Sequence, residues 1–172
     1  MASPTVDAIA EYHNDVDRSL RLFFSELSPS FTVRFFGLTT DEIRNELLAR
    51  LEETDQRSAF FVLTSLEAAF KVDYQFRCRK KLKDALSREF RELYKRREMR
   101  VHLEEDIFEA WKEHHPETRR FIAEMKGAFK FRHWMAHGRF GEQRFGRKKY
   151  DFAFLFSLAD SILTALPLQN SE

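Results

Sequence analysis

The residue types that could carry chemistry gather in one short stretch, residues 129–139. It holds His133 and His137, four positions apart, and Arg132 and Arg139 flank the two histidines. An unperturbed imidazole titrates near pH 6.5, so it can give or take a proton at neutral pH. An arginine stays charged and can bind two oxygens of a phosphate at once. Polar groups between aromatic residues of an expected core segment indicate a functional site. The alternative is an ordinary helix end, where cations interact favourably with the helix dipole.

A metal site is the second chemistry to weigh at this spacing. His133 and His137 share one face of a helix, as the two histidines of zinc proteases do. That protease motif needs a glutamate directly after the first histidine, and Trp134 occupies the position here. Arg132 and Arg139 would also repel a divalent cation. The sequence therefore predicts no metal site in this stretch and no small-molecule cofactor.

Basic residues form two blocks, although the net charge of the chain is only +1. Residues 77–100 hold 11 Lys and Arg against 4 Asp and Glu, and residues 126–149 hold 8 against 1. The other segments are acidic, with net charges of −6 over 1–76, −4 over 101–125 and −3 over 150–172. If the fold joins the two basic blocks, they form a surface that attracts phosphates. The alternative is that both blocks are solvated helix faces and loops.

The elements that position these residues are helices. No segment alternates apolar and polar residues over six positions, whereas apolar residues recur at helical spacing. Thr39 and Glu42 match a capping box, and the polar run 52–57 is a candidate interruption of the helix that follows. Gly138 is a candidate helix stop, and Asp151 opens the last helix. The expected helices cover about 5–27, 40–51, 57–80, 82–98, 103–114, 116–138 and 152–166. The sequence predicts an all-α bundle of five to seven helices.

The composition fits a single helical domain over residues 1–172. Of these residues 43% are apolar, and a chain of this length hides roughly 70% of its extended surface. No apolar run approaches the length of about 18 residues that a membrane span needs. The N-terminus has neither the basic start nor the apolar stretch of a signal peptide. Cys78 is the one cysteine, which excludes an internal disulfide and a cysteine-based zinc site. We expect a cytoplasmic protein with no membrane partner.

The spacing Arg132, four residues, His137 resembles the motif of the HEPN superfamily (higher eukaryotes and prokaryotes nucleotide-binding). The ribonucleases of this all-helical family carry Arg, four to six residues, then His. The residue after that Arg is often Asn, Asp or His, and here it is His133. Four stretches are also similar to a bacterial subgroup, the RiboL-PSP type: residues 66–74, 103–107, 127–133 and 145–152. The resemblance covers about residues 38–166, and the helix over about 5–27 precedes it.

The resemblance implies metal-independent cleavage of RNA. In such enzymes the 2′-hydroxyl attacks the adjacent phosphate and leaves a 2′,3′-cyclic phosphate end. A base must take the 2′ proton, an acid must protonate the leaving oxygen, and a fixed cation must stabilise the phosphorane. Arg132 is the expected cation, and His137 is the expected base or acid. His133 is either the second proton carrier or a structural helper. A role as a toxin or defence effector is part of the same expectation.

Helix geometry constrains how the motif can work. Residues five apart lie about 140° apart around the axis, so Arg132 and His137 do not share a face unless the helix breaks between them. His133 and His137 do share a face. The family solves this problem with a dimer that brings two copies of the motif to one cleft. The resemblance therefore implies a homodimer with its active site at the dimer cleft.

Several residues near the motif are candidate RNA contacts. The cations are Lys130, Arg139, Arg147, Lys148 and Lys149. Phe140 and Phe145 either stack on unpaired bases or attach the loop to the core.

Glu67 is the candidate for an acidic residue that supports the motif, a feature that the family often places on an earlier helix. The alternative for Glu67 is a plain ion pair. Some HEPN toxins carry a tyrosine two residues after the motif histidine, which a partner enzyme modifies. Arg139 stands at that position, so an antitoxin of that kind is not implied and the residues identify no regulatory partner. Two functions remain: an endoribonuclease, or a non-catalytic HEPN-like module that binds RNA or a protein. Only the first needs Arg132 and His137 for turnover.

Overall fold

The computed structural model describes residues 4–98, 100–139 and 148–169. Within these residues the chain forms helices and no strand, which confirms the predicted all-α fold. Their seven α-helices are α1 (Val6–Phe23), α2 (Phe31–Arg34), α3 (Thr40–Lys80), α4 (Ala85–Arg97), α5 (Phe108–His114), α6 (Arg119–Ala136) and α7 (Phe152–Ala165). A π-helical turn, η1 (Leu103–Ile107), precedes α5, and a 3₁₀ turn, η2 (Pro116–Thr118), precedes α6. None of the helices in these ranges has both the length and the apolar character that a membrane crossing needs.

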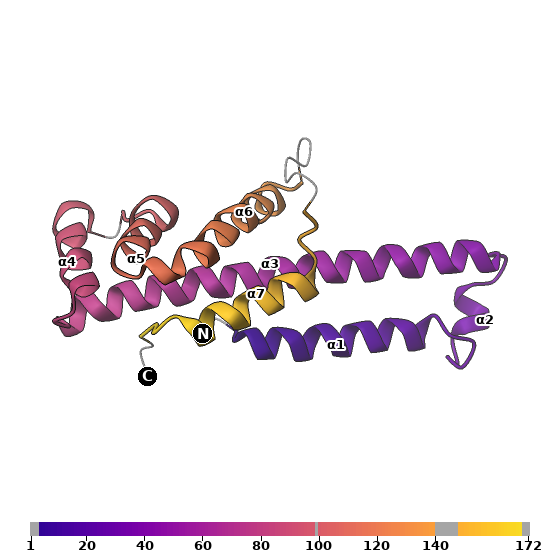
Figure 1. Cartoon of the computed structure of the whole chain (residues 1–172). Coiled ribbons are helices and arrows are strands. Elements are labelled where there is room, and N and C mark those ends of the chain that lie inside the picture. Colours follow the sequence, from indigo (N-terminus) through magenta and orange to yellow (C-terminus); the bar gives the residue numbers. More distant parts are fainter. Residues whose placement is uncertain (1–3, 99, 140–147, 170–172) are drawn as a thin grey trace.

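The 41-residue helix α3 is the axis of the molecule (Figure 1). It begins with the predicted capping box, in which the Thr39 hydroxyl accepts from the Glu42 N–H and Glu42 accepts from the Thr39 N–H. The expected interruption at 52–57 was wrong, because the helix runs through it. Four of the six residues of that run, Glu52, Glu53, Gln56 and Arg57, are good helix formers, and they form pairs one turn apart such as Arg57 with Glu53.

The first half of α3 packs against α1, and α2 closes the turn between them. Figure 1 shows this helical arm extending away from α4, α5 and α6. The Thr5 hydroxyl caps the start of α1 by accepting from the Ala8 N–H. The helix ends at Phe23, earlier than the predicted residue 27, and its C-cap is Phe24. Turns follow before α2. The Ser25 hydroxyl donates to the Leu22 carbonyl, the hydroxyls of Ser28 and Ser30 form a hydrogen bond, and Pro29 lies between these two serines.

The second half of α3 packs with α4, α5, α6 and α7 around a common core. The largest fully buried side chains include Trp111, Tyr74, Phe70, Phe90 and Phe108. The rings of Phe70 and Phe108 meet edge to face, with centroids 5.1 Å apart. The helix predicted over 103–114 is divided here into η1 and α5.

α6 runs back along α3 and carries the candidate site near its C-terminal end (Figure 1). Gly138 has a φ of +71° and ends this helix, as predicted. Gly127 lets the segment before α7 pass very close to α6, because a Cβ there would stand 2.6 Å from the Tyr150 Oη. Asp151 caps α7 through its carboxylate, which accepts from the Phe154 N–H, again as predicted.

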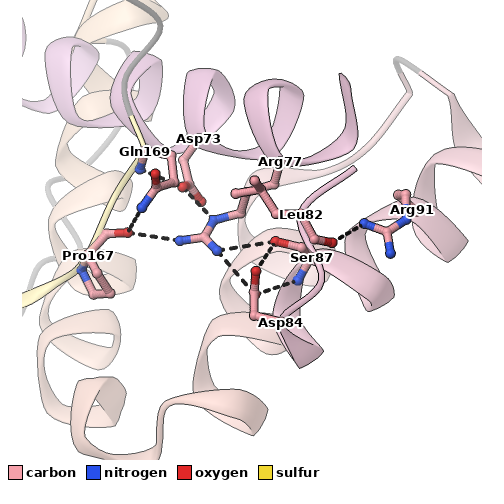
Figure 2. Close-up of polar contacts among 8 residues, drawn as sticks. All are labelled: Asp73, Arg77, Leu82, Asp84, Ser87, Arg91, Pro167 and Gln169. Carbon is pink, nitrogen blue, oxygen red and sulfur yellow. Dashed lines mark hydrogen bonds and ion pairs between the residues drawn. The ribbon is translucent and has the colours of Figure 1, made fainter. Parts of the chain in front are cut away.

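A buried ion pair ties the end of α3 to α4 and to the C-terminal segment (Figure 2). The Nε of Arg77 donates to Asp73 at 2.6 Å, and these side chains are only 5% and 0% exposed. The same guanidinium donates to Asp84 and to the carbonyl of Pro167. Asp73 also accepts from the Gln169 N–H, so one charge pair holds three separate segments together.

Candidate functional site

Arg132 is held against α3 by an ion pair with Glu67. Glu67 also accepts from Lys71 at 2.7 Å, and the Arg132 guanidinium lies 5.8 Å from the centre of the Phe129 ring. The Arg132 side chain is 31% exposed and that of Glu67 is 16% exposed. A guanidinium has five N–H donors, and one carboxylate uses only part of them. Arg132 is therefore oriented by Glu67 and still has donors to offer to an anion.

The Nε of Arg132 adds a second observation. It is buried, and it has no hydrogen-bond partner within the described ranges. Such a donor is costly unless a partner satisfies it. The guanidinium is thus positioned by packing and by one carboxylate rather than by a full set of hydrogen bonds.

His133 and His137 form a contacting pair on the exposed face at the end of α6. Their ring centroids are 4.2 Å apart and the rings are inclined by 52°. Both side chains are exposed, which suits groups that exchange protons with a bound ligand. The prediction that the two histidines share a face is confirmed.

The helix does not break between Arg132 and His137. α6 continues to Ala136, and His137 is its C-cap residue with φ −91° and ψ 24°. Arg132 consequently points to α3 while the two imidazoles point to solvent. In one protomer the Arg132 guanidinium and the two imidazoles therefore lie on different sides of α6.

Arg139 lies apart from Arg132 and makes its own ion pair across to α3. It donates to both oxygens of Glu53, at 2.8 and 2.7 Å, and it holds the pKa of Glu53 below its usual range. Arg139 has a φ of +61°, a left-handed conformation that a non-glycine residue rarely adopts. This contact fixes the chain just beyond the motif, so the predicted phosphate contact at Arg139 competes with a structural role.

The other predicted RNA contacts lie around the same end of α6. Lys130, Lys148 and Lys149 are exposed. The Lys148 ammonium stands 4.6 Å from the centre of the Phe154 ring, and Lys149 is 3.7 Å from Asp151. Arg147, Phe140 and Phe145 lie outside the described residues.

A cleft of about 670 Å³ opens between α1, α3 and the segment that enters α7. Asp55, Gln56, Phe131, Lys149 and Tyr150 are among its lining residues. Asp55 accepts from the Phe152 N–H at 3.2 Å, and burial raises the pKa of its carboxyl. The cleft therefore offers polar groups beside aromatic rings.

Sequence reasoning missed Lys71, which pairs with Glu67, and Glu53, which pairs with Arg139. Lys71 carried a usable signal, because it follows Glu67 by four positions on a helix. Glu53 carried none, since its partner Arg139 lies 86 positions away.

A possible metal-ligating group lies elsewhere in the described residues. Glu89, Glu113 and His114 bring ligand atoms within 4.8 Å of one another, between α4 and α5. His114 already contacts Glu89 at 2.5 Å. Neither histidine of the motif belongs to this group.

Comparison with models of known families, with curated proteins and with solved structures produced no match for this chain.

Proposed function

We propose that the protein is a metal-independent endoribonuclease that leaves 2′,3′-cyclic phosphate ends. The observation that carries the proposal is the Arg132–Glu67 ion pair, which orients a guanidinium one residue before an exposed imidazole. The resemblance of this motif to HEPN ribonucleases supports the same conclusion. So do the exposed lysines beside it, because phosphate contacts supply most of the affinity for a nucleic acid.

The imidazoles and Arg132 are the kinds of group that this reaction requires. One imidazole takes the proton of the 2′-hydroxyl, and the 2′-oxygen forms a bond to phosphorus. The bond from phosphorus to the 5′-oxygen breaks, and a protonated imidazole supplies the proton to that oxygen. Arg132 stabilises the negative charge that grows on the equatorial oxygens.

Two copies of the chain complete this arrangement in our proposal. Base and acid must stand on opposite sides of the phosphate, each within hydrogen-bond reach of about 3 Å. The rings of His133 and His137 touch, so no phosphate fits between them. A homodimer that faces two motifs across one cleft supplies the opposite imidazole. Within a cell the proposed substrate is cytoplasmic RNA, and the proposed role is that of a toxin or defence effector.

The test is cleavage of an RNA oligonucleotide in EDTA, with the new ends identified by mass spectrometry. We expect Arg132→Ala and His137→Ala to reduce the rate about 10² to 10⁴-fold. Arg120→Gln and His102→Ala are matched controls, because both residues are exposed and lie outside the motif, and both should retain activity. An oligonucleotide with 2′-deoxy residues should not be cleaved.

Three results would contradict the proposal. Cleavage of the 2′-deoxy substrate would exclude attack by the 2′-hydroxyl. Undiminished cleavage by folded Arg132→Ala protein would place the activity elsewhere. RNA that binds but is never cut, even by a dimeric preparation, would support the non-catalytic binding module instead.

A further inference from the structure

Five exposed cations surround the junction of α3 and α4, and we call them the basic end: Arg79, Lys80, Lys81, Lys83 and Arg88. Within the described residues none of them forms an ion pair with a carboxylate. Lys80 stands 5.9 Å from the centre of the Phe76 ring, and Lys81 is the left-handed C-cap of α3. The basic end is therefore an uncompensated patch of positive charge.

The nearest acidic residues are already committed to other partners (Figure 2). Asp84 accepts from Arg77, from the Ser87 hydroxyl and from the Ser87 N–H, and these contacts hold its pKa low. Glu89 contacts His114. The carboxylates of Asp84 and Glu89 are thus engaged by other partners, and within the described residues the five cations of the basic end have no carboxylate partner.

Helix stabilisation accounts for only part of this charge. Arg79 and Lys80 suit the negative end of the α3 dipole. Lys83 and Arg88 lie at the start of α4, because Asp84 is the N-cap of that helix. Cations near a helix N-terminus are unfavourable, so their presence there points to another role.

An exposed stripe along α3 links the basic end to the candidate active site. Lys71, Gln75 and Arg79 are exposed and follow Glu67 at steps of four residues. Successive members of such a series lie about 6 Å apart along the axis and turn by about 40°. Arg79 is therefore about 18 Å along α3 from Glu67, which holds Arg132, and about 120° around the helix axis from it.

We infer that the basic end binds the flanking phosphates of a single-stranded RNA whose scissile phosphate lies at Arg132. The stripe is one side chain wide, so it follows one sugar-phosphate backbone rather than the two of a duplex. The inference rests on the proposed function, and it adds a substrate requirement. A good substrate must extend at least about 18 Å from the cleaved bond.

The test measures binding without cleavage, so it stands apart from the catalytic proposal. Fluorescent 2′-O-methyl RNAs of about 4 and about 16 nucleotides would be titrated over a series of salt concentrations. We expect the double variant Arg79→Gln, Lys83→Gln to bind the long RNA several-fold more weakly. Its slope of log affinity against log salt should be less steep by about 1.4, which is two phosphate contacts. The short RNA should bind the double variant and the wild type equally.

The matched control is Arg18→Gln, Arg44→Gln, which removes the same charge from exposed positions on the helical arm. An equal loss in the control would mean that net charge alone sets the affinity and would overturn the inference. So would an unchanged salt slope in the Arg79, Lys83 variant. Weaker binding of the long RNA by the Arg79, Lys83 variant, with no cleavage in any assay, would sustain RNA binding at the basic end and reject the nuclease.

Discussion

Arg139, which follows α6, donates to both carboxylate oxygens of Glu53 on α3, 86 positions away in the sequence. Together with Arg132 and Glu67, this ion pair brackets the motif and holds the end of α6 at two points along one long helix. The histidines lie between these two points. The position of the imidazoles therefore depends on the packing of α6 against α3 as much as on the motif.

The Arg139–Glu53 pair should contribute a small, pH-dependent stability. Its side chains are both 34% exposed, so Arg139→Ala should lower the free energy of unfolding by no more than about 1 kcal/mol at pH 7. Because the folded state lowers the pKa of Glu53, the contribution is present above the ordinary value of 4.5 and disappears as the pH falls through the folded pKa. Urea unfolding of both proteins at pH 7 and pH 3 measures this. A difference that persists unchanged at pH 3 would contradict it.

The Arg77–Asp73 pair should contribute far more to the free energy of unfolding, because it is buried. Arg77→Met leaves a buried carboxylate without its partner and should cost about 3–5 kcal/mol in urea unfolding. Burial already raises the pKa of Asp73 despite its bond to Arg77. The double variant Asp73→Leu, Arg77→Met should recover most of the loss. A double variant no more stable than the single one would show that the other contacts of Arg77 carry the stability.

A side chain at position 127 should destabilise the protein while Tyr150 keeps its hydroxyl. Gly127→Ala places a Cβ at 2.6 Å from the Tyr150 Oη, and the overlap should cost about 1–3 kcal/mol. Tyr150→Phe removes the overlapping atom, so the double variant should recover part of this cost. Thermal unfolding of the four proteins of this cycle gives the coupling energy. If the effects of the two substitutions are strictly additive, the cost of Gly127→Ala does not come from overlap with the Tyr150 hydroxyl.

Cys78 should be slow to react in the folded protein. Burial raises the pKa of its thiol to about 11, and only the thiolate attacks a disulfide reagent. At pH 8 the folded protein should therefore react at least about a hundredfold more slowly than the same protein in urea. The rate of thionitrobenzoate release measures both states. Equal rates would mean that local opening exposes the thiol readily.

Glu67→Gln tests whether Glu67 positions Arg132 for catalysis or contributes to RNA binding. The amide cannot hold the guanidinium as the carboxylate does, and a displacement of about 1 Å can cost about 10²-fold in rate. We expect a lower kcat with little change in KM for RNA, and a stability within about 1 kcal/mol of the wild type. Arg50→Gln is the control, since it removes an equivalent ion pair of the same helix, with Glu46, and leaves Glu67 and Arg132 in place. An equal loss in the control would reject a positioning role for Glu67.

The local elements of this protein could be predicted from the sequence. Caps depend on residues three positions apart, so Thr39 with Glu42 and the N-cap Asp151 were correctly identified. Helical spacing likewise placed His133 beside His137. The prediction failed where two local signals competed, as at 52–57, where a polar run resembled a break but its side chains pair along the helix.

Local sequence patterns are thus sufficient for most of the helices, for their caps and for the histidine pair, because each depends on contacts within about one turn. The partners of Arg132 and Arg139, and the cations that remain exposed at the end of α3, follow from the placement of the helices in three dimensions. These features depend on how α6 and α4 pack against α3, which results from many small contacts across the whole core. Glu53 and Arg139 illustrate the point, because no pattern joins residues 86 positions apart until the helices lie side by side.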